Sequence, residues 1–259
     1  KFSHLNEGEI ILLENIRYFK EEGNDDENFS KKLGSLGDIY INDAFSCSHR
    51  KQASIHNITK FVKKSYAGPL LKKEIEAINL VVQNKKEPVT CIIGGSKIST
   101  KINVITSLIE KVNNLIIVGA MANNFFVYKN LKVGKSLIEE NTMEIIRKIY
   151  KKADQNKCEV LIPEDCMVST SFAGNGVNKD LKTIKDNEII LDIGLKTINS
   201  IKHKIEQSKT VLWNGPAGYF ENENFINGTM SIAKKISENT KNKSLISILG
   251  GGDTISAIN

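Results

Sequence analysis

The stretch Val89-Thr90-Cys91-Ile92-Ile93-Gly94-Gly95-Ser96-Lys97-Ile98-Ser99-Thr100-Lys101 decides the fold, because it joins an apolar run to a glycine turn and the start of an amphipathic segment. An uninterrupted run of five apolar or small residues is typical of a strand buried on both faces of a parallel sheet. Residues 102–112 carry apolar side chains at helical spacing. The stretch therefore predicts a strand, a turn and a helix, with the turn at the end of the strand where open α/β sheets bind ligands.

The same plan recurs three times along the chain. Residues 115–118 lead into Gly119 and a further helical segment, residues 210–213 lead into Asn214-Gly215-Pro216, and residues 245–249 lead into Gly250-Gly251-Gly252. Short buried strands that alternate with helices predict a doubly wound parallel sheet. The region 87–259 is therefore predicted to be an α/β domain.

A smaller region precedes this domain. Residues 10–13 and 38–41 are predicted strands, and residues 70–83 have the apolar spacing of one long helix. The sequence therefore predicts a two-lobed α/β protein: residues 1–68 are part of a first lobe, residues 69–86 a connecting helix, and residues 87–259 the second lobe. A length of 259 residues also exceeds one ordinary core.

Composition excludes several classes of protein. With 40% hydrophobic and 25% charged residues the chain is expected to fold as a soluble protein, and no apolar run is long enough to cross a bilayer. Its first residues form no signal peptide. The four cysteines lie far apart, as expected for reduced cytosolic thiols without a zinc site. The net charge of +6 is scattered, so neither nucleic acid nor a membrane is a predicted partner.

The turn Gly94–Lys101 has the features of a phosphate site. Two glycines allow close approach of the backbone, the following helix begins with free N–H groups, and Lys97 and Lys101 are four residues apart. The alternative is a plain strand-to-helix turn with solvated lysines. The turn lacks the Walker A pattern G-x-x-x-x-G-K-[ST]. Gly134-Lys135-Ser136 matches the end of that pattern, but Lys129 occupies the position of its first glycine.

Two other turns present polar groups after strands. Gly250-Gly251-Gly252 exposes a run of backbone N–H groups suited to an anion, and Asp253 after it is either a helix N-cap or a ligand for Mg²⁺ on nucleotide phosphates. In the segment 213–221, Asn214 and Glu221 are candidates to contact phosphate and ribose. A structural turn with a packed Trp213 is the alternative there.

Arginine is rare in this lysine-rich chain, which contains only Arg17, Arg50 and Arg147. Arg17 and Arg50 follow the two predicted strands of the first lobe, where forked donors suit a carboxylate or phosphate. His49 on its own has the character of a structural residue. Together these residues predict an anionic substrate on the first lobe and a nucleotide on the second.

The chain resembles the phosphoglycerate kinase family, in its bacterial type, over essentially all of its length. The motifs that carry the resemblance are collinear: Leu13-Glu14-Asn15-Ile16-Arg17, Asn42-Asp43-Ala44-Phe45 with His49-Arg50, Gly94-Gly95-Ser96-Lys97 with Lys101, Leu191-Asp192-Ile193-Gly194, Trp213-Asn214-Gly215-Pro216 with Phe220-Glu221, and Gly250-Gly251-Gly252-Asp253-Thr254. The resemblance implies Rossmann-like lobes that close about a hinge. It also implies a monomeric, cytoplasmic, glycolytic kinase that moves a phosphoryl group between 1,3-bisphosphoglycerate and ADP, with Mg²⁺, giving 3-phosphoglycerate and ATP.

The resemblance also implies roles for individual residues. Catalytic roles fall to Lys97, Arg17 and Gly252, and substrate binding to Arg17, Arg50 and His49. Asp253 would hold Mg²⁺ through the nucleotide phosphates. The nucleotide site would comprise Gly95, Ser96, Lys97, Lys101, Gly119, Leu137, Gly194, Asn214, Pro216, Glu221, Gly250, Gly251, Gly252, Asp253 and Thr254.

The sequence departs from the family pattern in a few places. The amino-terminal R-x-D-x-N and H-x-G-R-P segments and the carboxyl-terminal T-G-G-G-A motif are absent, and Ala120 and Leu195 replace residues common in the family. We therefore expect a fragment truncated at both ends, with little or no turnover of its own. A nucleotide-binding module without catalysis is the second hypothesis. A dinucleotide-dependent dehydrogenase is disfavoured because no strand is followed by G-x-G-x-x-G.

Overall fold

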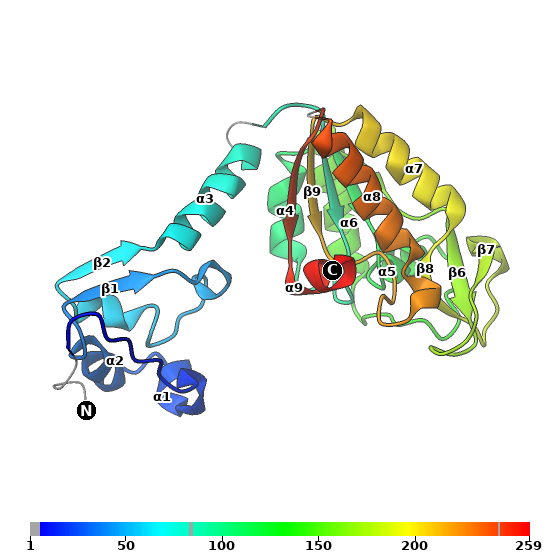
Figure 1. Ribbon diagram of the computed structural model, residues 1–259. Coiled ribbons are helices and arrows are strands. Elements are labelled where there is room, and N and C mark those ends of the chain that lie inside the picture. Colours follow the sequence, from blue (N-terminus) through cyan, green and yellow to red (C-terminus); the bar gives the residue numbers. More distant parts are fainter. Residues whose placement is uncertain (1–5, 83–84, 243) are drawn as a thin grey trace. The chain divides into compact units, whose positions relative to one another are not determined.

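The computed structural model describes residues 6–82, 85–242 and 244–259, which form two compact units, Lys1–Asn79 and Leu80–Asn259 (Figure 1). Parts of the predicted first lobe, connecting helix and second lobe fall on residues 1–5, 83–84 and 243, which lie outside the described residues. None of the described helices has the length and hydropathy of a membrane-spanning segment.

The first unit is built around a small parallel sheet. Strand β1 (Ile39–Asn42) pairs with β2 (Lys64–Ala67), with Ile39 opposite Lys64. The other elements, in chain order, are η2 (Ile16–Tyr18), α1 (Lys20–Gly23), α2 (Glu27–Gly34), η3 (Phe45–Cys47), η4 (Asn57–Lys60) and α3 (Pro69–Val82). Helix α3 coincides with the helix predicted at residues 70–83 as far as Val82, the last residue described there.

The strand predicted at residues 10–13 is wrong. This segment has no regular secondary structure, and Ile10 and Leu12 are 93% and 95% exposed. A strand needs a neighbour to satisfy its N–H and C=O groups. Among the described residues, β1 and β2 pair only with each other, so the apolar run at 10–13 lacks the partner that would make it a strand.

The second unit contains a five-stranded parallel sheet in the order β10-β9-β3-β4-β5. Its strands are β3 (Val89–Ile93), β4 (Asn114–Ile117), β5 (Glu159–Leu161), β9 (Thr210–Asn214) and β10 (Ile246–Gly250). The chain moves outward from β3 through β4 to β5, then returns to the other side of β3 with β9 and β10. The strand order thus reverses between β3 and β9, as in doubly wound folds. This confirms the predicted fold class.

Helices of the second unit contribute to two apolar clusters. Ile105, Phe125 and Ile149 of α4, α5 and α6 belong to one, and Ile201 and Ile232 of α7 and α8 to the other. Figure 1 shows α7 and α8 side by side. These helices are α4 (Ile102–Ile109), α5 (Ala122–Tyr128), α6 (Met143–Gln155), α7 (Leu195–Gln207) and α8 (Asn227–Lys241), and α9 (Gly252–Ile258) follows β10.

An antiparallel sheet in the second unit was not predicted from the sequence. It consists of β6 (Asp165–Ser169) between β7 (Val177–Asp180) and β8 (Ile189–Ile193). The 3₁₀ turn η5 (Leu181–Thr183) directly follows β7, and η6 (Glu223–Phe225) lies between β9 and α8. Three of the four residues of β7 are polar and the pairing of β6 with β8 contains a bulge, so these strands give little periodic signal.

Candidate nucleotide-binding site

Glycine turns meet backbone to backbone where the strand order reverses. The N–H of Gly94, after β3, donates to the carbonyl of Asn214, at the end of β9, at 2.8 Å. A Cβ atom at Gly94 would lie 2.1 Å from the carbonyl oxygen of Pro216, and one at Gly215 would lie 2.4 Å from the oxygen of Gly94. Gly215 also has a φ of 94°, which favours glycine. The two turns can therefore approach this closely only because they lack side chains.

A third turn joins this arrangement from β4. The N–H of Gly119 donates to the carbonyl of Ala217 at 3.1 Å, and the N–H of Met121 donates to the carbonyl of Gly95 at 2.9 Å. The turns after β3, β4 and β9 thus form one hydrogen-bonded surface at the carboxyl edge of the sheet. This is the edge at which doubly wound folds bind ligands.

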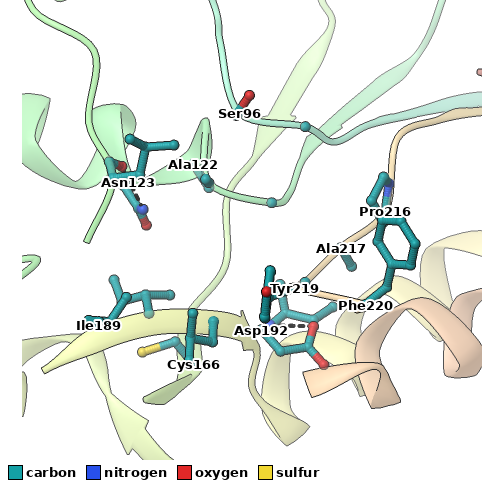
Figure 2. Close-up of a pocket in the computed structure, with 18 of the residues that line it drawn as sticks. Ser96, Ala122, Asn123, Cys166, Ile189, Asp192, Pro216, Ala217, Tyr219 and Phe220 are labelled. Atoms are coloured by element: carbon teal, nitrogen blue, oxygen red, sulfur yellow. Dashed lines mark hydrogen bonds between the residues drawn. The ribbon is translucent and has the colours of Figure 1, made fainter. Parts of the chain in front are cut away.

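A cavity of about 390 Å³ opens against this surface (Figure 2). Its other walls come from α5 and the antiparallel sheet. The residues that line it are Gly95, Ser96, Gly119, Ala120, Ala122, Asn123, Phe126, Leu137, Pro163, Cys166, Phe172, Ile189, Ile190, Leu191, Asp192, Ile193, Pro216, Ala217, Gly218, Tyr219, Phe220, Glu221 and Asp253. Apolar walls with a few polar groups are typical of a small-molecule site.

The cavity brings together part of the predicted nucleotide set. Gly95, Ser96, Gly119, Leu137, Pro216, Glu221 and Asp253 line it. The other predicted members, Lys97, Lys101, Gly194, Asn214, Gly250, Gly251, Gly252 and Thr254, do not line it. Most of the latter lie in the turns that border the cavity.

Lys101 is anchored at the centre of the glycine turns. Its ammonium donates to the carbonyl of Gly94 at 2.7 Å and to Oδ1 of Asn214 at 2.8 Å. Partial burial lowers the pKa of Lys101, and attraction by Asp253 offsets this in part. Lys101 therefore joins the β3 turn to the β9 turn. Lys97 is exposed, and its carbonyl accepts a bond of 2.9 Å from the Thr100 hydroxyl.

The turn after β10 supplies an exposed carboxylate. Gly251 has a φ of 93°, Gly252 has open space around its Cα, and Asp253 lies in the first turn of α9. The N-cap position of α9 is occupied by Gly251, and Asp253 lies two residues further on, in the first turn, so the interpretation of Asp253 as the N-cap is wrong. Thr254 is fully buried: its hydroxyl accepts from the Gly215 N–H at 2.7 Å and donates to the Gly250 carbonyl at 2.8 Å.

Trp213 packs beneath the β9 turn. It is fully buried, and its Nε1 donates to the carbonyl of Gly215 at 2.8 Å. Of the two interpretations of the segment 213–221, the structural turn with a packed tryptophan therefore applies to Trp213. Glu221 lies farther along the same loop, exposed and at the cavity.

Gly194 lies apart from the cavity, against a buried carboxylate. A Cβ atom at Gly194 would lie 2.2 Å from Cγ of Asp165. Asp165 accepts from the N–H groups of Lys196 and Thr197 at 3.0 and 2.9 Å, at the start of α7. Burial would raise the pKa of Asp165, but hydrogen bonds from Thr197, Lys196 and Asn178 outweigh it and hold the pKa below its usual value.

Sequence reasoning missed most of the cavity walls. Asn123, Phe126 and Phe172 come from helix α5 and from a loop, and no turn or motif marked them. Tyr219 lay within the predicted segment 213–221 but was given no role there. Asp192 was quoted only as part of a motif, yet its buried carboxylate lines the cavity (Figure 2). Burial raises the pKa of Asp192 to about 7, opposed by hydrogen bonds from the N–H groups of Gly228 and Ile193. An apolar neighbourhood around a lone acid was its only sequence signal.

In the first unit, Arg17 borders a smaller cavity of about 220 Å³. Arg17 shares this cavity with residues that include Asn42, Asp43 and Gln52. Arg50 and His49, predicted to join Arg17 in binding substrate, are exposed and do not line it. The structure therefore places one of the three predicted substrate residues at a cavity.

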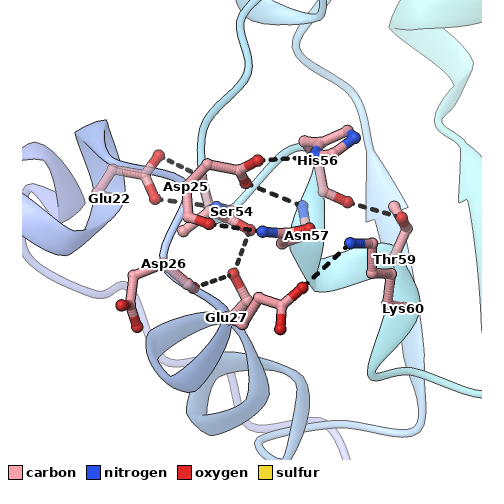
Figure 3. Close-up of polar contacts among 11 residues, drawn as sticks. Glu22, Asp25, Asp26, Glu27, Ser54, His56, Asn57, Thr59 and Lys60 are labelled. Atoms are coloured by element: carbon pink, nitrogen blue, oxygen red, sulfur yellow. Dashed lines mark hydrogen bonds and ion pairs between the residues drawn. The ribbon is translucent and has the colours of Figure 1, made fainter.

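A polar network holds the chain that follows Arg50 (Figure 3). The buried Glu22 accepts from the N–H and hydroxyl of Ser54 at 2.9 and 2.6 Å. Asp25 pairs with Nδ1 of His56 at 2.7 Å, and its carbonyl accepts from Nδ2 of Asn57 at 2.5 Å. The network holds residues 54–57 against α1 and the residue Asp25 that follows it. Glu22 and Asp25 therefore have a structural role.

Within residues 6–82, 85–242 and 244–259, no group of three or more His, Cys, Asp and Glu is arranged to hold a metal ion. Asp253 is an exposed carboxylate beside a cavity, without a partner in its own helix turn. One carboxylate of this kind fits an ion held mainly by substrate phosphates, which is how Mg²⁺ is commonly bound.

The fold and the cavity together define a doubly wound α/β protein with a ligand site at its topological switch point. The family model for phosphoglycerate kinase matches residues 1–259, and the chain belongs to the phosphoglycerate kinase family.

Known proteins similar to the chain carry the same family name. It is 47% identical over 253 residues to a phosphoglycerate kinase of Wolbachia pipientis from Culex pipiens, covering 97% of this chain and 64% of that protein. It is 43% identical to the chloroplastic phosphoglycerate kinase 1 of Arabidopsis thaliana, covering 98% of this chain and 53% of that protein. The structure of phosphoglycerate kinase from Coxiella burnetii superposes with a TM-score of 0.82 at 34% identity, over 94% of this chain and 62% of that one. The chain thus spans less than two thirds of the length of these relatives.

Proposed function

We propose that this protein acts as a phosphoglycerate kinase, which transfers a phosphoryl group reversibly from 1,3-bisphosphoglycerate to ADP and gives 3-phosphoglycerate and ATP. The observation that carries the proposal is the cavity at the switch between β3 and β9, bordered by hydrogen-bonded glycine turns and by Lys101. Family membership supplies the substrate class.

The proposed nucleotide site lies in the unit Leu80–Asn259. The apolar walls, with Leu137 and Phe172, suit a nucleobase, and Glu221 is placed to accept from ribose hydroxyls. Backbone N–H groups of Gly95, Ser96, Gly251 and Gly252, with Lys101, suit the phosphates. Lys97, exposed on the same turn, is the cation we assign to the transferring phosphoryl group.

The proposed substrate site lies in the unit Lys1–Asn79, with Arg17 at its cavity and Arg50 and His49 on exposed segments near it in sequence. Arginine suits this task because its fork binds carboxylate and phosphate oxygens in pairs. The acceptor and donor of the reaction are anions, so cations and backbone N–H groups stabilise the transition state and no side-chain nucleophile is needed.

Mg²⁺ would be held by Asp253 and by the nucleotide phosphates, and when bound it neutralises charge on phosphate oxygens. We also propose that the protein acts as a cytoplasmic monomer on small-molecule substrates. The sequence lacks the family's R-x-D-x-N and H-x-G-R-P segments, so the 259-residue chain is expected to bind nucleotide with little or no turnover.

Calorimetric titration of the chain with MgADP tests the nucleotide site. Saturable one-to-one binding is expected, and Asp253→Ala should weaken MgADP about tenfold while leaving binding of adenosine nearly unchanged, because the carboxylate acts only through the metal and phosphates. Absence of MgADP binding by the unmutated, folded chain would refute the proposal. Formation of ATP from 1,3-bisphosphoglycerate by a protein that also carries the missing segments tests the reaction itself.

A further inference from the structure

Two neighbouring asparagines of α5 hold a segment at the wall of the cavity. Leu137 lines the cavity, and its carbonyl accepts a hydrogen bond of 2.9 Å from Nδ2 of Asn123. Two residues later, the N–H of Glu139 donates to Oδ1 of Asn124 at 2.8 Å. The backbone of residues 137–139 is therefore fixed relative to α5, and the side chain of Glu139 starts from a defined position.

The carboxylate of Glu139 reaches the glycine turn on the other side. Its Oε2 accepts from the backbone N–H of Ser99 at 3.1 Å, and its Oε1 accepts from the Ser99 hydroxyl. Both donors of one residue thus bind both oxygens of one carboxylate. Ser99 lies between Lys97 and Lys101, so this pair, the Glu139–Ser99 clasp, acts on the turn that carries both lysines.

The clasp is made by a charged acceptor. The pKa of Glu139 lies below its ordinary value, because of the Ser99 hydroxyl first and the Ser99 N–H second, with a smaller contribution from Lys97. Hydrogen bonds to an ionised carboxylate are shorter and stronger than neutral ones. The clasp is therefore present in full at neutral pH, although its atoms lie near the protein surface.

From this geometry we infer that Glu139 is a positioning residue, which couples the cavity wall at Leu137 to the phosphate side of the site by holding Ser99 in place. The inference rests on the proposed nucleotide binding. Glu139 itself does not line the cavity, so it acts through the turn of Lys97 and Lys101. Loosening that turn lowers affinity because the lysines and N–H groups must then be ordered when nucleotide binds.

A double-mutant cycle on the 259-residue chain tests the coupling. Glu139→Ala removes both bonds of the clasp and is expected to weaken MgADP binding about fivefold. Ser99→Ala removes the hydroxyl bond and keeps the backbone N–H bond, so it should weaken binding less than Glu139→Ala. The double variant should bind MgADP no more weakly than Glu139→Ala alone, because that change has already opened the clasp. Glu139→Gln keeps an acceptor oxygen and should fall between Glu139→Ala and the unmutated chain. The exposed neighbour Glu140, with no side-chain hydrogen bond among the described residues, gives the matched control Glu140→Ala, which should bind as the unmutated chain does.

Hydrogen exchange without nucleotide separates this inference from the proposed function. Glu139→Ala should speed amide exchange in residues 96–101 severalfold and leave the melting temperature and the exchange of β3 unchanged. Unaltered exchange at 96–101, additive losses in the cycle, or faster exchange throughout the unit with a lower melting temperature would each overturn the positioning role. A chain with the expected exchange pattern but without MgADP binding would support the clasp and refute the nucleotide site.

Discussion

The hydroxyl of Thr254 accepts a 2.7 Å hydrogen bond from the backbone N–H of Gly215, which joins the start of α9 to the turn after β9. The same hydroxyl donates to the carbonyl of Gly250 at 2.8 Å. Thr254 was predicted to bind nucleotide, and its full burial with both bonds made inside the protein favours an indirect role. It fixes the two turns that border the phosphate side of the cavity.

Thr254→Val should therefore lower the free energy of unfolding by about 1–3 kcal/mol, because the Gly215 N–H is left buried without an acceptor. Denaturant unfolding of the chain measures this. Thr254→Ser keeps the hydroxyl and should lose clearly less. Equal losses in the two variants would show that the methyl group, and not the hydrogen bond, stabilises this junction.

Gly94→Ala should destabilise the second unit by about 3 kcal/mol, the upper end of the usual cost of overpacking, since the new methyl group meets the carbonyl of Pro216, which is backbone and has little room to move. Gly252→Ala provides the control because nothing lies within 4 Å of its Cβ position. That variant should keep the stability of the parent chain or gain a few tenths of a kcal/mol from reduced freedom of the unfolded chain. Thermal unfolding followed by circular dichroism compares the two.

The buried carboxyl of Asp192 should make stability fall as pH rises. Its folded-state pKa of about 7 exceeds the ordinary value of 3.8, so the folded protein holds a proton that the unfolded chain loses. Stability should decline between about pH 4 and pH 7, by at most about 1.4 kcal/mol per pH unit, and the loss should be complete above pH 7. Asp192→Asn should flatten this part of the profile, measured by denaturant unfolding across the range. An unchanged slope would contradict the assignment.

The carboxyl of Asp165 should make stability fall as pH is lowered, the opposite of the effect of Asp192. Its pKa is held below the ordinary value, so its contribution is present above about pH 4 and is lost as pH falls through the folded-state pKa. Asp165→Asn should remove that acid-side loss and should also weaken the start of α7, where the carboxylate accepts from Lys196 and Thr197. The same unfolding profile, extended to pH 2.5, measures both effects.

The sequence was sufficient for four of the five strands of the parallel sheet, because each of these four combined an apolar run with a glycine turn. The fifth strand, β5, is followed by Pro163 without a glycine turn and was not predicted. The runs at 89–93, 115–118, 210–213 and 245–249 correspond to β3, β4, β9 and β10. The run at 10–13 is also apolar, although no glycine turn follows it, and it forms no strand, because a strand also needs a neighbour, which a local pattern does not specify. The antiparallel sheet was missed because β7 is mostly polar and because the apolar run of β8, which Gly194 follows, was not interpreted as a strand.

For the site, the glycines and Asp253 were found because they sit in turns after strands. Phe172 and Tyr219 were missed because they reach the cavity from loops whose position depends on tertiary contacts. Asp192 could not be distinguished from a surface acid until its burial was known. Lys101 was predicted to serve the phosphates, whereas its bonds to Gly94 and Asn214 depend on how the β3 and β9 turns pack.

The contact of Gly94 with Gly215 bears on inhibitor design. Gly94 and Gly215 meet through main-chain atoms with no space for a side chain, and their chain neighbours Gly95 and Pro216 line the cavity, so a substitution at either of the two glycines would displace that part of the cavity wall. A compound meant to bind this cavity selectively must therefore gain its selectivity from exposed side chains such as Leu137 and Phe172, where replacement changes the shape of the cavity without moving the glycine turns.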